Sequence, residues 1–98
     1  MKKILSVAVL GSTGYVGLEL VKILIRHPNI QIKFLGCENS PSKDIREFDQ
    51  NIVIDTLPKL DLNNNFDLKN YDLVFLSLPH GVSHKFVKNF NRKIKIID

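Results

Sequence analysis

The chain has 98 residues, of which 44% are hydrophobic and 24% charged, a composition typical of one globular domain that excludes a disordered tail. No apolar run approaches the roughly 20 residues that span a bilayer, so we expect no membrane partner and a cytoplasmic location. The net charge is +4, but the lysines and arginines are spread along the chain, which disfavours a nucleic-acid partner.

The chain begins with a predicted strand that leads through a glycine-rich turn into a helix. Residues 4–10 are apolar and partly β-branched, which is typical of a strand buried on both faces. Residues 18–27 have apolar positions at helical spacing. Pro28 ends this helix, because proline disfavours helical geometry in the residue before it.

The turn between this strand and helix has the features of a phosphate site. Its spacing is G-x-x-G-x-x-G. Glycines let the backbone approach a diphosphate closely, and the free N–H groups of a helix N-terminus attract an anion. An ordinary tight turn is the alternative, but the strand before and the helix after favour a dinucleotide site. The residues expected to bind it are Gly11, Ser12, Thr13, Gly14, Tyr15, Val16 and Gly17.

The rest of the chain continues the alternation of strands and helices. Residues 30–35 predict a strand near a sheet edge, and residues 73–78 predict a strand buried on both faces. Residues 44–50 predict a short helix. A longer helix carries apolar residues at positions 82, 86 and 90, and residues 94–97 begin another strand.

Two segments between these elements are less regular. Residues 51–60 leave two alternatives open, a short strand at 52–54 or an extended segment at 57–60. The three asparagines at 63–65 predict a turn.

These elements predict one α/β domain over residues 1–98, a Rossmann-like parallel sheet with helices on both faces. The sheet looks truncated at its C-terminus, because the chain ends on a strand of the buried type. Ligands of such sheets bind beyond the carboxyl ends of the strands, where the strand order reverses. A second loop is expected there, with Pro79, His80 and Gly81 as cofactor or substrate contacts. For His80, an ordinary exposed loop histidine is the alternative.

Four segments together carry a resemblance to a known enzyme family. They are Gly-Ser-Thr-Gly-Tyr-Val-Gly-Leu-Glu-Leu at 11–20, His27-Pro28, Leu57-Pro58-Lys59-Leu60, and Leu-Ser-Leu-Pro-His-Gly-Val-Ser at 76–83. They resemble the N-acetyl-γ-glutamyl-phosphate reductases of the semialdehyde dehydrogenase superfamily. Leu-Pro-His-Gly at 78–81 distinguishes this family from the aspartate-semialdehyde dehydrogenases. The resemblance covers essentially the whole chain, but only the first part of such an enzyme.

The resemblance implies NADP-dependent reduction of N-acetyl-γ-glutamyl phosphate to the semialdehyde, through a cysteine thioester, in arginine biosynthesis. It also implies that the whole enzyme is a homo-oligomer. The nucleophilic cysteine and catalytic histidine of that family lie beyond the part that the chain covers, so we expect no catalytic residue here and no turnover by the chain alone. Cys37 is the only cysteine and is interpreted as a packing or surface residue. No His/Cys cluster has metal-ligand spacing, so no metal is expected.

The end of the second predicted strand bears on the choice between NADP and NAD, because the adenine ribose lies there. Glu38 favours the 2′-hydroxyl of NAD. Ser40, Ser42, Lys43 and Arg46 follow it and are candidates to hold the 2′-phosphate of NADP. The resemblance favours NADP, and NAD stays the alternative.

Two other functions remain open. An NADP-binding domain like that of aspartate-semialdehyde dehydrogenase would share the glycine motif. A non-catalytic dinucleotide-binding module would fit a chain without a visible catalytic residue. A short-chain reductase is disfavoured, because neither Tyr15 nor Tyr71 is followed by lysine four residues later.

Overall fold

The computed structural model describes residues 4–52, 56–66, 71–78 and 95–97. They form one sheet of five strands with the order β3-β2-β1-β4-β5, and every pair of neighbours is parallel. The strands are β1 (Leu5–Leu10), β2 (Ile30–Cys37), β3 (Leu60–Leu62), β4 (Leu73–Leu76) and β5 (Lys95–Ile97). The predicted α/β, Rossmann-like parallel sheet is therefore confirmed.

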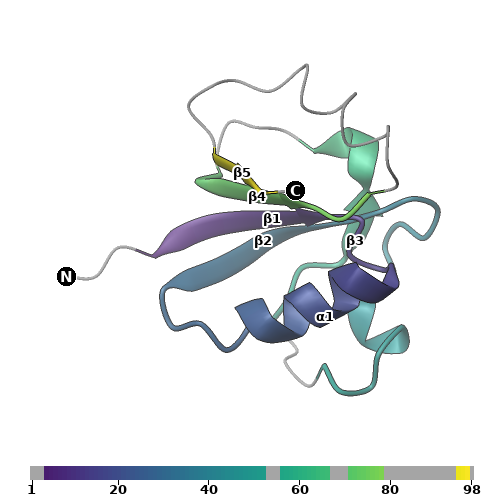
Figure 1. Ribbon diagram of the computed structural model, residues 1–98. Helices are drawn as coiled ribbons and strands as arrows, with labels where there is room; N and C mark the ends of the chain where they lie inside the picture. The colour runs from purple at the N-terminus through teal and green to yellow at the C-terminus, as the bar shows by residue number, and fades with distance from the viewer. Residues whose placement is uncertain (1–3, 53–55, 67–70, 79–94, 98) are drawn as a thin grey trace.

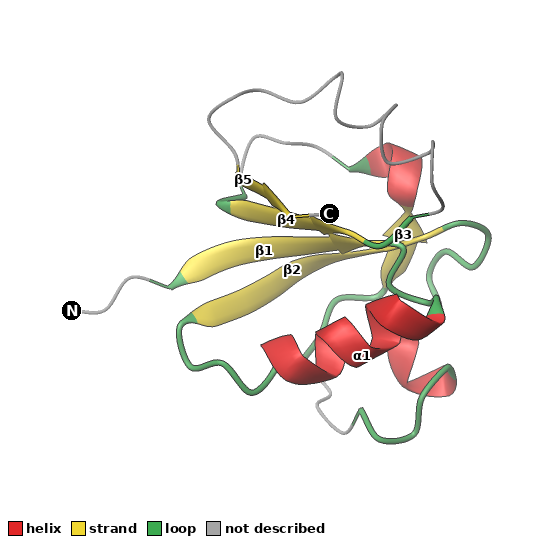
Figure 2. Cartoon of the chain, viewed as in Figure 1, coloured by secondary structure: helices red, strands yellow, loops and turns green. Residues whose placement is uncertain are grey.

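One α-helix, α1 (Tyr15–Leu24), packs across the sheet among the described residues, and its first turn lies at the carboxyl end of β1 (Figure 1). Two short 3₁₀ helices flank β3 in the chain, η1 (Ile45–Glu47) before it and η2 (Asn63–Asn65) after it. Figure 2 shows α1 on one side of the sheet and the helix that follows β3 on the other. The helix predicted around residues 82–90 lies outside the described residues.

The side chains of the central strands alternate between two apolar clusters, as the period of a strand requires. Val7 and Val9 of β1 pack on the α1 side, together with Val21 of the helix. Ala8 and Leu10 point to the opposite face. All four of these β1 residues are fully buried, so the sheet is covered on both faces along this part of β1.

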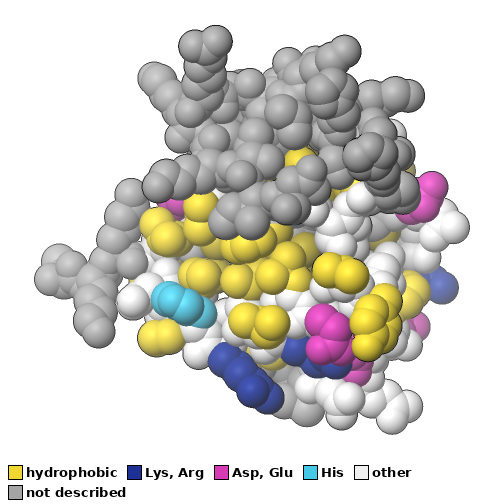
Figure 3. Space-filling view, viewed as in Figure 1, with side chains coloured by type: hydrophobic (Ala, Val, Ile, Leu, Met, Phe, Trp, Pro, Cys, Tyr) yellow, Lys and Arg dark blue, Asp and Glu magenta, His cyan; other side chains and the backbone are white. Residues whose placement is uncertain are grey.

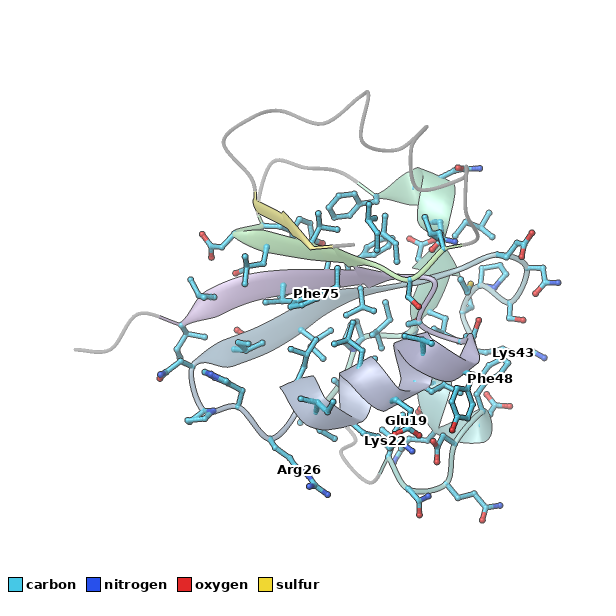
Figure 4. All side chains as sticks on the ribbon, in the orientation of Figure 1. Glu19, Lys22, Arg26, Lys43, Phe48 and Phe75 are labelled. Atoms are coloured by element: carbon cyan, nitrogen blue, oxygen red, sulfur yellow. The ribbon has the colours of Figure 1, made fainter. Side chains whose placement is uncertain are left out.

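The α1 side of the sheet also holds the segment around η1. Ile45 and Ile52 are buried in the same cluster as Val21. Lys22 of α1 forms ion pairs with Glu19 and Asp49, each at 2.8 Å (Figure 4). On the face seen in Figure 3, acidic and basic side chains accordingly lie side by side near α1, and apolar side chains occupy the centre.

The element boundaries depart from the predictions in ways that have local causes. Helix α1 begins at Tyr15 rather than Leu18, since the end of the glycine motif is already helical, and it ends at Leu24 with Ile25 as its C-cap. Strand β2 continues to Cys37, two residues past the predicted end. The predicted strand at 73–78 ends at Leu76.

The predictions for residues 44–65 had mixed outcomes. The short helix expected over 44–50 is limited to η1, which Asp44 and Glu47 cap reciprocally. In the ambiguous stretch, Ile52 is not in a strand, and residues 53–55 lie outside the description. The strand β3 starts at Leu60, the last residue of the predicted extended segment, and the asparagine turn is the 3₁₀ helix η2.

In the part of the chain that the structure describes, no helix is long and apolar enough to cross a membrane. Within the same residues, no group of three His, Cys, Asp or Glu side chains could hold a metal ion.

Candidate functional site

An open cleft of about 600 Å³ lies at the carboxyl ends of the strands, which is within the usual range for small-molecule sites. It is located where the strand order reverses, since β1 has β2 on one side and β4 on the other. Four segments line it: the β1–α1 turn, the end of β2, the end of β3 and the end of β4. The lining residues are Gly11, Thr13, Gly14, Tyr15, Val16, Glu38, Asn63, Leu76, Ser77 and Leu78.

Gly11 and Gly17 are required by the fold itself. Gly11 has φ +75°, and a Cβ there would overlap the carbonyl oxygen of Ser77 at the end of β4. A Cβ on Gly17 would overlap the carbonyl oxygen of Gly11 and lie 2.9 Å from Cα of Ser12. These two glycines therefore allow the turn to fold tightly against β4 and against the start of α1.

Gly14 lies in a different environment. Its backbone is extended, with φ −74° and ψ 166°, and an added Cβ would meet only the Gly11 carbonyl oxygen, at an ordinary 3.6 Å. The folded chain thus has room for a side chain here. Space beside Gly14 remains open at the wall of the cleft, where a ligand could approach the backbone.

The first turn of α1 offers hydrogen-bond donors at this place. Gly14 is the N-cap and provides no side-chain cap, and the first intrahelical bond runs from Leu18 N–H to the Gly14 carbonyl at 2.9 Å. The N–H groups of Tyr15, Val16 and Gly17 therefore have no partner within the helix. Donors of this kind at a helix N-terminus bind anions such as phosphate.

Ser12 is part of the predicted set, but the structure places it away from the cleft. It is fully buried. Its N–H and its Oγ–H both donate to the carbonyl oxygen of Gly36, each at 2.8 Å. These two bonds attach the glycine turn to β2, so Ser12 positions the turn in this structure.

Asn63, at the end of β3, was not among the predicted site residues. Its side-chain Oδ1 accepts a hydrogen bond from Gly11 N–H at 3.0 Å, and the residue lines the cleft. The only signal in the sequence was a polar residue directly after a strand. The pattern at 63–65 predicted a turn and gave no indication of contact with a residue 52 positions away.

The residues predicted to contact the adenosine end of a dinucleotide follow β2, and they differ in whether they line the cleft. Glu38 is exposed and lines the cleft, whereas Ser40, Ser42, Lys43 and Arg46 are not among the lining residues. Figure 4 shows the Lys43 side chain extending outward at the edge of the molecule.

Arg46 forms an ion pair with Asp44. Its Nε and Nη2 donate to the carboxylate of Asp44, with Nη2 at 2.8 Å from Oδ2. These side-chain bonds, together with the backbone N–H of Arg46, lower the pKa of Asp44 to about 2. Arg46 thus already has a carboxylate partner that a ligand phosphate would have to replace.

The second predicted loop is described only in part. Ser77 and Leu78, which lead into it, line the cleft beside Gly11. Pro79, His80 and Gly81 lie outside the described residues, so their expected contact with cofactor or substrate stays a prediction.

Comparison with known proteins gives consistent matches over nearly the whole chain. The N-acetyl-γ-glutamyl-phosphate reductase of Ehrlichia ruminantium is 40% identical over 93 residues, which cover 94% of this chain and 27% of that protein. A probable chloroplastic enzyme of the same name from rice is 33% identical, over 94% of this chain and 22% of that protein. The chain therefore spans about a quarter of the length of the curated relatives it matches.

A solved structure supports the same fold. The aspartate semialdehyde dehydrogenase of Candida albicans, crystallised with NADP, superposes with a TM-score of 0.74 at 24% identity, over 96% of this chain and 29% of that one. The family model described as the semialdehyde dehydrogenase NAD-binding domain matches residues 6–98. The chain therefore belongs to the semialdehyde dehydrogenase family, as its NAD-binding domain.

Proposed function

We propose that this chain is the dinucleotide-binding part of an N-acetyl-γ-glutamyl-phosphate reductase. The observation that carries the proposal is the glycine turn at the point where the strand order reverses, with free N–H groups beside an open Gly14. The reductases that the chain resembles at 40% identity support the substrate. Aspartate-semialdehyde dehydrogenase is the weaker candidate, because that similarity is a likeness of fold at 24% identity.

The residues of the cleft fit the diphosphate of NAD or NADP. The N–H groups of Tyr15 and Val16 would donate to its oxygens, and Gly14 would leave room for it. Gly11 and Gly17 keep the turn in shape, and Ser12 attaches it to β2. The bound dinucleotide would supply the hydride for reduction of an acyl group.

NADP is our proposal for the physiological dinucleotide. It is supported by the resemblance to the reductase family and by the NADP in the crystals of the Candida albicans enzyme. Ser40 and Lys43 follow β2 and would have to turn toward the 2′-phosphate. Glu38 opposes this proposal, because a carboxylate at the end of the second strand favours a ribose 2′-hydroxyl.

The remaining parts of the proposal concern the whole protein. We expect it to reduce N-acetyl-γ-glutamyl phosphate in arginine biosynthesis, to form homo-oligomers and to work in the cytoplasm. His80 would lie near the nicotinamide end of the cleft as a positioning group. The nucleophilic cysteine would not be Cys37, which is buried in the apolar cluster on the α1 side.

Two measurements test the proposal. Calorimetry of the 98-residue chain with NADPH and NADH should show binding, with the tighter affinity for NADPH. Failure to bind either compound would refute the dinucleotide site, and tighter binding of NADH would assign Glu38 to the ribose. The protein in which this chain occurs should then oxidise NADPH with N-acetyl-γ-glutamyl phosphate and not with aspartyl phosphate. Binding without turnover of either substrate would indicate a non-catalytic module.

A further inference from the structure

The side chain of Asn63 has a fixed orientation at the wall of the cleft. Its bond with Gly11 joins a backbone N–H, which can only donate, to the side-chain amide, so the oxygen must face Gly11. The NH₂ group of the same amide therefore points away from Gly11. Asn63 is the first residue of η2 and follows β3 directly.

This NH₂ group has no partner within the described part of the chain. The bond to Gly11 uses only Oδ1. No polar side-chain atom of the described residues is both buried and unpartnered. The Nδ2 atom is therefore accessible, on a residue that lines the cleft.

The fold makes specific room for this side chain. A Cβ on Gly36 of β2 would overlap Oδ1 of Asn63 and would lie 3.0 Å from Cδ2 of Leu10. Asn63 thus reaches Gly11 across a position that has no side chain. The carbonyl of the same Gly36 accepts both bonds from Ser12. The first two residues of the glycine turn are therefore held by β2 and by the end of β3.

Those bonds also decide which donors remain for a ligand. The N–H of Gly11 is used by Asn63 and the N–H of Ser12 by Gly36. An anion at the base of the turn therefore lacks these two donors. The Asn63 side chain that accepts from Gly11 N–H also carries an unused NH₂ group. This NH₂ group can replace one of the two missing donors.

We propose that Asn63 is a binding residue of the diphosphate site: Oδ1 holds the glycine turn, and Nδ2 donates to a diphosphate oxygen of the bound dinucleotide. This assignment rests on the proposed dinucleotide function. In this assignment, the residue after β3 binds the diphosphate together with the residues of the β1–α1 turn.

Two variants of the 98-residue chain separate the two halves of this role. Asn63→Asp keeps an oxygen for Gly11 but loses the NH₂ donor. Asn63→Leu has a similar shape and loses both. Asn64→Asp is the charge-matched control, because Asn64 is exposed and is not among the residues that line the cleft.

Binding of NADPH, ADP and adenosine is measured for each variant, together with the hydrogen exchange of the Gly11 amide. For Asn63→Asp we expect a protected Gly11 amide, affinities for NADPH and ADP at least about tenfold weaker, and an unchanged affinity for adenosine. Asn63→Leu should lose the Gly11 protection as well. Asn64→Asp should stay within about twofold of the wild type for every ligand.

Two results would overturn the assignment. One is an Asn63→Asp variant that binds ADP as well as the wild type does. The other is a loss of adenosine affinity as large as the loss for ADP, which would move the contact to the nucleoside. A wild-type chain that binds neither ADP nor NADPH would instead refute the proposed function.

Discussion

Replacing Gly14 by alanine separates the needs of the ligand from those of the fold. The backbone at Gly14 is one that any L-residue adopts, and the new methyl group would meet only the Gly11 carbonyl oxygen, at 3.6 Å. Alanine is a poorer N-cap than glycine, by roughly 0.5 kcal/mol. The lower entropy of the unfolded chain offsets about the same amount. We therefore expect the free energy of unfolding to change by less than about 0.5 kcal/mol.

The same methyl group should weaken dinucleotide binding strongly. It would occupy the space through which a diphosphate approaches the N–H groups of Tyr15 and Val16. Loss of one hydrogen bond to a charged oxygen costs about 1.5–3 kcal/mol, which is roughly a tenfold to hundredfold weaker affinity. Calorimetry with NADPH gives the affinity, and thermal unfolding followed by circular dichroism gives the stability.

Gly17→Ala is the matched control for this experiment. Its Cβ would overlap the Gly11 carbonyl oxygen and press on Cα of Ser12, both of which are backbone atoms that have little freedom to move. Overpacking of this kind costs about 1–3 kcal/mol or more, so this variant should unfold at a clearly lower temperature. A Gly14→Ala variant that binds NADPH like the wild type would contradict a role of Gly14 in ligand binding. One that destabilises the chain as much as Gly17→Ala does would contradict the space found beside Gly14.

Four further predictions concern neighbouring residues and the chain as a whole. Gly14→Ser should raise the unfolding temperature by a few degrees in a melting experiment, because the hydroxyl of a serine N-cap accepts hydrogen bonds from the helix N–H groups. Since those donors are then occupied, NADPH binding measured by calorimetry should be weaker. Glu38→Gln should strengthen NADPH binding up to about fivefold without strengthening NADH binding, and equal gains for both would refute a role at the 2′-phosphate. In Arg46→Met, an NMR titration should find the pKa of Asp44 raised from about 2 toward 3.8. Because the pKa of Asp44 is lower in the folded than in the unfolded wild-type chain, its ionised form stabilises the fold, and this stabilisation should be lost as the pH falls from about 4 to about 2. The variant should not show this loss. The 98-residue chain alone should bind NADPH but show no turnover with N-acetyl-γ-glutamyl phosphate, and measurable turnover would place the catalytic groups within it.

Much of the fold was predictable from the sequence because its signals are local. The apolar run before Gly11 and the helical spacing after it indicate a strand and a helix. Together they predict that the glycine turn lies at the edge of the sheet where open α/β sheets bind their ligands. Strand β3 has only three residues. A strand this short carries little pattern of its own, and pairing with Leu35 and with the loop at 42–43 determines where it lies.

The internal arrangement of the site could not be predicted in the same way, because it depends on partners far along the chain. Ser12 is adjacent to Thr13 in sequence, yet only Thr13 lines the cleft, since Ser12 bonds to Gly36 on the neighbouring strand. The hydrogen bond between Asn63 and Gly11 similarly depends on the absence of a side chain at Gly36. Neither relation leaves a trace in local spacing.

The described glycines differ in whether the fold leaves room for a side chain. At Gly11, Gly17 and Gly36, a Cβ would overlap backbone or the Asn63 side chain, so the fold alone accounts for the glycine. At Gly14 there is space, and serine or aspartate would cap α1 better. A better cap, however, would use the N–H groups that face the cleft. Leaving helix α1 without a side-chain cap keeps these donors available, as the proposed dinucleotide site requires.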